Sequence, residues 1–334
     1  MMQLIEGSVG ACGHVLALRM KAILVFDSAM LLSMKKLLSC LCLGFPLAVF
    51  AEAYPSISDA AFHGDVDAVH VFLSDGASVN EGDSRGWTPL HNAAYAGNMG
   101  VPQVLLDAGG DANALTASGM SALHLLAMFS CEEAFKHFAA YADLFERFLA
   151  EDEKQGPALG AFCVKVEASK EATASALVHA GAEVNCAYGD ALVTPLFLAA
   201  RRGASGVVSV LLEEGQANTD ARSFYEGSYG VSALHVAVKK GHVDAARLLI
   251  SHGADINAVD EVGKTPLHYA VGRGHFGAVQ MLVESGADVQ ATDLYRQTPH
   301  AFAVTLLHSD RPDLFSRECY EPIVAYLTSF EPSE

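Results

Sequence analysis

The feature that most constrains this chain is a short phrase that recurs at regular intervals. The phrase reads TPLHNAAYAGN, SALHVAVKKGH or TPLHYAVGRGH, and its copies begin at Thr88, Ser121, Thr194, Ser232, Thr265 and Thr298. Successive copies start 33, 73, 38, 33 and 33 residues apart. A fixed period in this range indicates stacked supersecondary units, each a copy of the same local structure.

The residues that begin and end helices predict a pair of helices in one unit. Thr265 can cap a helix with its hydroxyl group, and Pro266 suits the first turn, where the N–H groups lack partners in any case. Gly274 ends this helix, since glycine adopts the left-handed conformation at low cost. A second helix is predicted from Phe276 to Glu284, and Gly286 ends it. Such a pair is too small to bury its own apolar face, so neighbouring pairs must stack.

These features resemble ankyrin repeats. The period of 33, the TPLHxA phrase, the GH that follows it and the GADxNA segment are similar to that family's motif. The resemblance covers residues 56–330 apart from one insertion, and it gives six to seven repeats. It implies an all-α solenoid of helix-turn-helix units with projecting finger loops. Its inner helices and fingers would form a concave protein-binding surface without chemistry of its own.

The same resemblance assigns structural roles to individual residues. It implies that a repeated imidazole hydrogen-bonds to the backbone within and between repeats instead of binding a metal; the copies are His91, His124, His235 and His268. The last unit, at 298–330, carries His300 and Ala301 where leucine and histidine are usual. That departure is typical of a capping repeat with a polar outer face.

The segment before the repeats has the order of a secretory signal peptide. Residues 34–53 contain two lysines, an apolar run of about 14 residues and the small-residue pattern that ends at Ala53. The run is short for a membrane span, which needs about 20 residues. We therefore expect residues 1–33 to be extraneous, cleavage after Ala53 and a mature domain at 54–334. A genuine extension and a lipoprotein anchored at Cys40 are the alternatives.

Charge and motifs disfavour most other functions. The net charge of −18 argues against nucleic-acid binding and against an anionic membrane surface. The stretch GRGHFG has the spacing of a dinucleotide fingerprint, but it joins two short helices instead of following a strand. The sequence contains no HExxH, GxSxG, P-loop or EF-hand motif. We expect no catalytic site, no metal and no cofactor.

One departure from the period adds about 40 residues, at roughly 130–170. An apolar stripe from Phe135 to Leu149 predicts an amphipathic helix there, which either packs on the array or meets a partner. The stretch QGPALG is expected to break the structure before a second helix near 172–180. Cys131 and Cys163 flank the insertion and either form a disulfide or remain reduced and buried.

A second departure lengthens one finger by five residues and gives it aromatic side chains. Aromatics and arginine are enriched at interface hot spots. The candidate partner-binding residues on this and the other fingers are Trp87, Met120, Tyr188, Phe224, Tyr225, Tyr229, Tyr295 and Arg296. The alternative for each is that it packs against a neighbouring finger.

The resulting interpretation is a monomeric, non-enzymatic scaffold of the bacterial periplasm that binds a protein partner. A short signal with two lysines is typical of bacteria. A family precedent is a periplasmic ankyrin protein that supports an oxidative-stress enzyme such as catalase, and this chain resembles it in architecture. Two alternatives stay open: a secreted effector that acts on host proteins, and an enzyme that uses the insertion.

Overall fold

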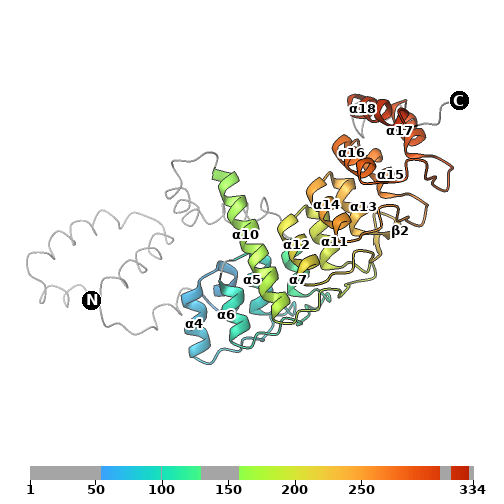
Figure 1. Ribbon diagram of the computed structural model, residues 1–334. Coiled ribbons are helices and arrows are strands. Elements are labelled where there is room, and N and C mark those ends of the chain that lie inside the picture. Colours follow the sequence, from blue (N-terminus) through green and yellow to red (C-terminus); the bar gives the residue numbers. More distant parts are fainter. Residues whose placement is uncertain (1–53, 99, 129–157, 309–316, 331–334) are drawn as a thin grey trace, which may run out of the picture.

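The chain forms an elongated array of helix pairs stacked side by side (Figure 1). The computed structural model describes residues 54–98, 100–128, 158–308 and 317–330. The expected signal peptide, the extension before it and Cys131 lie outside these residues. Cys163 lies in a described helix, but its side chain is not described. None of the helices in the described part combines the length and apolar character that crossing a bilayer requires.

The helices lie in two layers, one for each position in the repeat. The first helices are α3 (Ile57–His63), α5 (Pro89–Ala96), α7 (Ala122–Met128), α11 (Pro195–Arg202), α13 (Ala233–Lys240), α15 (Pro266–Gly272) and α17 (Pro299–Leu307). The second helices are α4 (Val66–Ser74), α6 (Val101–Asp107), α10 (Ala158–His179), α12 (Ser205–Glu213), α14 (Val243–Ser251), α16 (Phe276–Glu284) and α18 (Arg317–Thr328). Each helix contacts the same-layer helices of the adjacent repeats. This confirms the solenoid that the period predicts.

The repeated phrase works as a cap and as a tie between repeats. The Ser232 hydroxyl accepts the His235 N–H, and the His235 ring accepts the Ser232 N–H, which closes a capping box. The opposite ring nitrogen of His235 lies 3.1 Å from the carbonyl oxygen of Lys264 in the next finger. His124 and His268 make the same bond to the following repeat, at 3.0 Å. The structural role that the resemblance implied is confirmed for these three imidazoles. His91 closes its own capping box, but its Nε2 finds no hydrogen-bond partner among the described residues.

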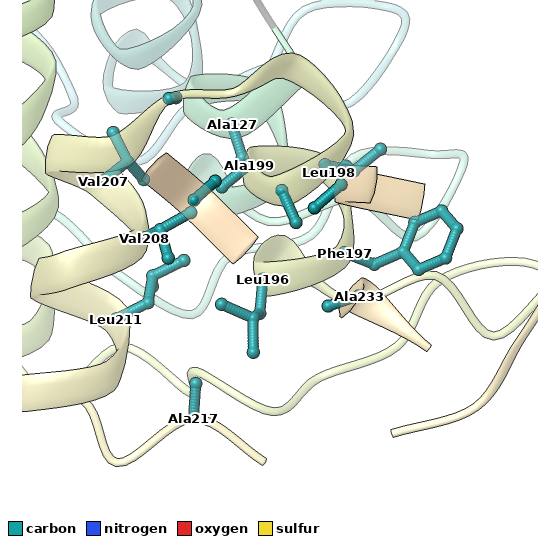
Figure 2. Close-up of a cluster of buried hydrophobic side chains, with 14 of the residues drawn as sticks. Ala127, Leu196, Phe197, Leu198, Ala199, Val207, Val208, Leu211, Ala217 and Ala233 are labelled. Atoms are coloured by element: carbon teal, nitrogen blue, oxygen red, sulfur yellow. The ribbon is translucent and has the colours of Figure 1, made fainter. Parts of the chain in front are cut away.

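Apolar side chains between the two layers form one continuous core. Around α11 and α12, Leu196, Ala199, Val208 and Leu211 interdigitate with small residues of the neighbouring repeats (Figure 2). Each of these four side chains is at most 1% exposed. Burying a leucine or valine side chain stabilises the fold by about 1.5–3 kcal/mol. Because each repeat buries its face only against its neighbours, stability depends on the stack as a whole.

The second helix of the third repeat begins earlier than the sequence indicates. It runs from Ala158, whereas the sequence predicts a start near Ala172, so residues 158–160 form the first residues of the helix instead of a break. Pro157 precedes the first helical residue, and proline is tolerated at a helix start, so the Gly-Pro pair marks a beginning as readily as a break. The later part of the insertion therefore extends α10, where Ser169 donates to the Gly97 carbonyl oxygen at 2.8 Å. The predicted amphipathic stripe lies outside the described residues.

Candidate partner-binding surface

The longer finger is a β-hairpin. Strand β1 (Ser223–Tyr225) pairs antiparallel with β2 (Ser228–Val231), and the two-residue turn between them is Glu226-Gly227. Both turn residues have positive φ, 49° and 86°, as the favoured hairpin turns require. The adjacent fingers hold the hairpin on both sides, through Phe224 N to Ala191 O and Glu261 N to Tyr229 O, each 2.9 Å. The extra residues are therefore ordered by backbone hydrogen bonds.

Alternation along the strands separates the aromatic side chains of the hairpin. Phe224 and Tyr229 lie together, with ring centroids 4.4 Å apart, and they are 36% and 56% exposed. Tyr225 points to the opposite face, as successive strand residues must. Its ring packs edge-on against Phe197 of α11 at 5.6 Å. Tyr225 is therefore half-buried against the first helices, which agrees with the packing alternative for this candidate.

Tyr225 belongs to a group of side chains that we call the hairpin cluster: Tyr225, Glu226, Lys239, Tyr269 and Arg273. The Glu226 carboxylate accepts from Lys239 Nζ of α13 at 2.7 Å, and from the Arg273 guanidinium, just after α15, at 3.2 Å. The Lys239 ammonium group lies 5.1 Å from the ring centroids of both tyrosines. One carboxylate and one lysine thus connect the hairpin tip to two successive repeats.

Two opposing effects set the charge of Glu226. Partial burial by itself would raise its pKa, but hydrogen bonds from Lys239 and Tyr225 outweigh this and lower the pKa to about 2. Burial and the adjacent carboxylate raise the pKa of Tyr225 to about 12. Burial also lowers the pKa of Lys239, while its bond to Glu226 opposes that shift. At neutral pH the cluster therefore holds an ionised carboxylate next to neutral tyrosine hydroxyls.

A second carboxylate anchors the hairpin from the following finger. Asp260 is 5% exposed and accepts from the Tyr269 hydroxyl at 2.8 Å and from the Ser228 hydroxyl at 3.0 Å. Its other oxygen accepts the N–H groups of Val262 and Lys264 at 3.0 and 2.8 Å. Burial, and then Asp260, raise the pKa of Tyr269 above its ordinary value. The hydrogen bonds that hold this part of the array together thus use both oxygens of Asp260.

The other candidate residues are distributed along the array. The Trp87 ring packs edge-on against Tyr95 at 5.2 Å, and the Arg85 guanidinium lies over the Trp87 ring, 4.5 Å from its centroid. Tyr188 packs edge-on against the His124 ring at 5.1 Å. Met120 is half-buried at the base of its finger. These three therefore pack largely within the array, in contrast to the exposed pair on the hairpin.

The last finger carries the most exposed aromatic candidate. Tyr295 is 72% exposed, Leu294 beside it is 71% exposed, and Arg296 is exposed with a φ of 59°. Two repeats separate this tip from the hairpin, so the eight candidates do not form one site. Sequence reasoning missed Glu226, Lys239 and Arg273. The available signal was the basic ends of successive first helices, which read RR, KK and GR.

The described residues contain no arrangement suited to a metal or an activated nucleophile. Among them, no group of three or more histidine, cysteine, aspartate or glutamate side chains could hold a metal ion. Cys186 Sγ lies 3.6 Å from Ser121 Oγ and 3.9 Å from His124 Nδ1, but His124 is committed to its capping and inter-repeat bonds. Burial raises the pKa of the Cys186 thiol, which disfavours the reactive thiolate.

Comparison with known proteins agrees with this architecture. The human and zebrafish (Danio rerio) proteins named "Ankyrin repeat domain-containing protein 29" are 41% and 39% identical to the chain over 66 residues. That stretch is 20% of this chain and 21% of each relative, so the chain spans about a fifth of the length of these curated relatives.

Solved ankyrin repeat domains match a larger part of the chain. The human ASB11 ankyrin repeat domain is 19% identical, with a TM-score of 0.56, and the match covers 83% of this chain and 98% of that one. The ankyrin repeat domain of Bcl-3, described as a unique member of the IkappaB protein family, is 25% identical with a TM-score of 0.54; 80% of this chain and 96% of that one are covered. The sequence model of "Ankyrin repeats (3 copies)" matches residues 57–147, 161–260 and 223–293. The chain therefore belongs to the ankyrin repeat family.

Proposed function

We propose that this chain is a non-enzymatic scaffold that binds a protein partner through its finger side, centred on the hairpin. The observation that carries the proposal is the exposed pair of Phe224 and Tyr229, whose rings lie 4.4 Å apart on a finger longer than its neighbours. Ankyrin repeats bind protein partners, and large aromatic side chains dominate binding energy at such interfaces.

The way the hairpin is held supports a binding role. Its backbone is bonded to both adjacent fingers, and Glu226 fixes its tip to Lys239. The conformational entropy of this loop is therefore lost on folding and not on binding. A loop that is already ordered favours high affinity for a partner. The exposed rings also form an apolar patch that a soluble array does not need for its own packing.

We further propose that the chain acts outside the cytoplasm, in the bacterial periplasm. The support is the signal-like segment at 34–53, which ends four residues before α3 begins at Ile57. In that compartment an enzyme of oxidative-stress defence is the partner class that the family precedent suggests. Release into the medium would favour the secreted effector instead, so fractionation of the producing cells with antibody detection separates the two locations.

The binding proposal is tested by cross-linking and capture with the full chain, tagged at its C-terminus. The double variant Phe224→Ser/Tyr229→Ser should lose at least about 90% of a specific captured protein, since a true aromatic hot spot contributes at least about 2 kcal/mol. Leu115→Ser is the matched control, because Leu115 is 57% exposed on a different finger. Equal capture by the double variant and the wild type, with equal melting temperatures, would exclude the hairpin as the binding site.

A further inference from the structure

Basic side chains converge under the hairpin of a chain that is strongly acidic as a whole. The net charge is −18, yet Arg201, Lys239 and Arg273 from three successive repeats all surround Tyr225 and Glu226. The Arg201 guanidinium lies 6.0 Å from the Tyr225 ring centroid. Glu226 bonds to Lys239 and Arg273, and Asp260, which is bonded to Tyr269, adds a second negative charge, so three cations stand against two carboxylates. The cluster therefore holds a surplus of positive charge.

The carboxylate that meets these cations sits on a strained backbone. Glu226 has a φ of 49°, a region that side chains with a Cβ occupy at a cost and that glycine or asparagine usually fills in such turns. The structure retains the strain because the turn aims the Glu226 side chain at Lys239 and Arg273. Strain of this kind persists where the surroundings over-determine it, and functional sites are common examples.

The cluster is also open to solvent. The side chains of Glu226 and Arg273 are 41% and 33% exposed, while Lys239 is 12% exposed between the two tyrosine rings. A ligand carboxylate could therefore approach Arg273 from solvent. The rings of Tyr225 and Tyr269 would cover the apolar part of the segment that bears it. Arginine and aromatic side chains together are the residue types that dominate interface energetics.

We propose that the hairpin cluster recognises an acidic segment of the protein partner, whose carboxylate binds Arg273 and Lys239 in the place that Glu226 occupies in the free chain. This proposal rests on the proposed function and specifies the chemistry of the partner. A short acidic segment fits better than a long polyanion such as nucleic acid. The chain's negative charge repels a polyanion, whereas beyond about 8 Å salt screens the local attraction of the cluster.

The test is direct binding of a fluorescein-labelled hexaglutamate peptide to the purified full chain, followed by fluorescence anisotropy. Arg273→Gln and Lys239→Gln should each raise Kd at least about tenfold, a typical loss for one charged contact at an interface. Glu226→Gln should lower Kd severalfold, because it removes the resident competitor. Lys240→Gln is the matched control: it removes the same charge from the adjacent, exposed position and should leave Kd unchanged.

The arms of this experiment separate the possible outcomes. Arg273→Lys keeps the charge and should restore part of the binding, and melting curves identify any variant that fails to fold. Equal affinity of all variants for hexaglutamate, or stronger binding of a single-stranded oligonucleotide of equal charge, overturns the proposal. If the captured partner depends on Phe224 and Tyr229 but is unaffected by Lys239→Gln and Arg273→Gln, the scaffold function stands and the acidic-segment proposal falls.

Discussion

Lys239 donates a hydrogen bond to Glu226 at 2.7 Å, and this bond joins the last turn of α13 to the tip of the hairpin. The same ammonium group lies 5.1 Å from the centroids of the Tyr225 and Tyr269 rings. A lysine between two aromatic faces and a carboxylate gains both ion-pair and cation–π attraction. Because Glu226 is 41% exposed, solvent screens the ion pair and keeps its contribution small.

Replacing this lysine should therefore loosen the hairpin without unfolding the array. Lys239→Met keeps the aliphatic chain between the rings and removes the charge, so we expect a loss of about 1 kcal/mol in unfolding free energy. For a domain of this size that lowers Tm by about 2–4 °C. Lys240→Met is the control and should melt as the wild type does. A drop of more than 10 °C would mean that the lysine holds the core and not only the hairpin.

The buried imidazoles make stability depend on pH. Burial lowers the pKa of His124 and of His235 to about 4 in the folded chain, although carbonyl bonds oppose the shift. The unfolded chain takes up these protons near pH 6.5. The contribution of these histidines to the unfolding free energy is therefore fully present above pH 6.5. It is lost as pH drops from 6.5 towards 4, by the order of 3 kcal/mol for each histidine.

Urea unfolding at pH 7.5, 6 and 5 measures this dependence. His235→Gln should be less stable than the wild type at pH 7.5, because it alters the capping and inter-repeat bonds, but it should lose less stability on acidification. Glu226 contributes in a lower window, since its folded pKa of about 2 lies below the ordinary value for glutamate, so its contribution disappears only as pH falls from about 4 to 2. A wild-type unfolding free energy that is constant from pH 7.5 to 5 would contradict the role assigned to the histidines.

A cavity in the core should cost far more than the loss of a finger contact. Leu211 is fully buried between the two helix layers, and Leu211→Ala should destabilise the array by about 2–5 kcal/mol. Leu192→Ala makes the same chemical change at a side chain that is 57% exposed on a finger, and it should cost less than about 0.5 kcal/mol. Chemical unfolding followed by circular dichroism compares the two. Similar losses for both variants would contradict the burial that separates them.

The fold could be predicted from the sequence because each repeat encodes the same local structure. The TPLH phrase predicts a helix cap, a glycine predicts the end of a helix, and the period of 33 predicts the stack. An error in predicting one repeat therefore does not change the prediction for the others. The hairpin was harder to foresee, since its strands are three and four residues long. Its turn, Glu226-Gly227 between aromatic residues, was the available signal.

The hairpin cluster could not be predicted in the same way. Glu226 lies 13 residues from Lys239 and 47 from Arg273, and nothing in their local sequence indicates that the three side chains meet. Their contact depends on the register with which a five-residue extension folds back across two repeats. The direction of each aromatic side chain was equally hidden, because one residue of register decides whether Tyr225 faces solvent or α11.

Two predictions concern the signal-like segment and the two cysteines that flank the insertion, of which the structure describes only the backbone at Cys163. We expect cleavage after Ala53, which N-terminal sequencing of the native protein would show as a mature chain that begins at Tyr54. We also expect a Cys131–Cys163 disulfide, with fully reduced thiols as the alternative. Peptide mapping without reductant decides between them. An intact N-terminus at Met1 would contradict export, and alkylation of both thiols would exclude the disulfide.

The glycines of two successive fingers offer a test of how tightly the fingers stack. Gly86 and Gly119 occupy equivalent positions before the capping residue, with φ of 73° and 82°. A Cβ on Gly86 would lie 2.9 Å from the backbone nitrogen of Ala117 in the next finger, whereas a Cβ on Gly119 would meet nothing within 4 Å. Gly119→Ala should therefore cost about 1 kcal/mol from backbone strain alone.

Gly86→Ala should cost about 2 kcal/mol or more, because the same strain is joined by displacement of backbone that bonds Ala117 N to Arg85 O at 2.9 Å. Urea unfolding gives the difference between the two variants, and hydrogen exchange at Ala117 locates it. The Ala117 amide should exchange faster in Gly86→Ala and remain protected in Gly119→Ala. Equal losses of unfolding free energy and equal protection of the Ala117 amide in the two variants would contradict this prediction. They would show that the two fingers move apart to accept the extra methyl group, so that their stacked backbones are not rigid.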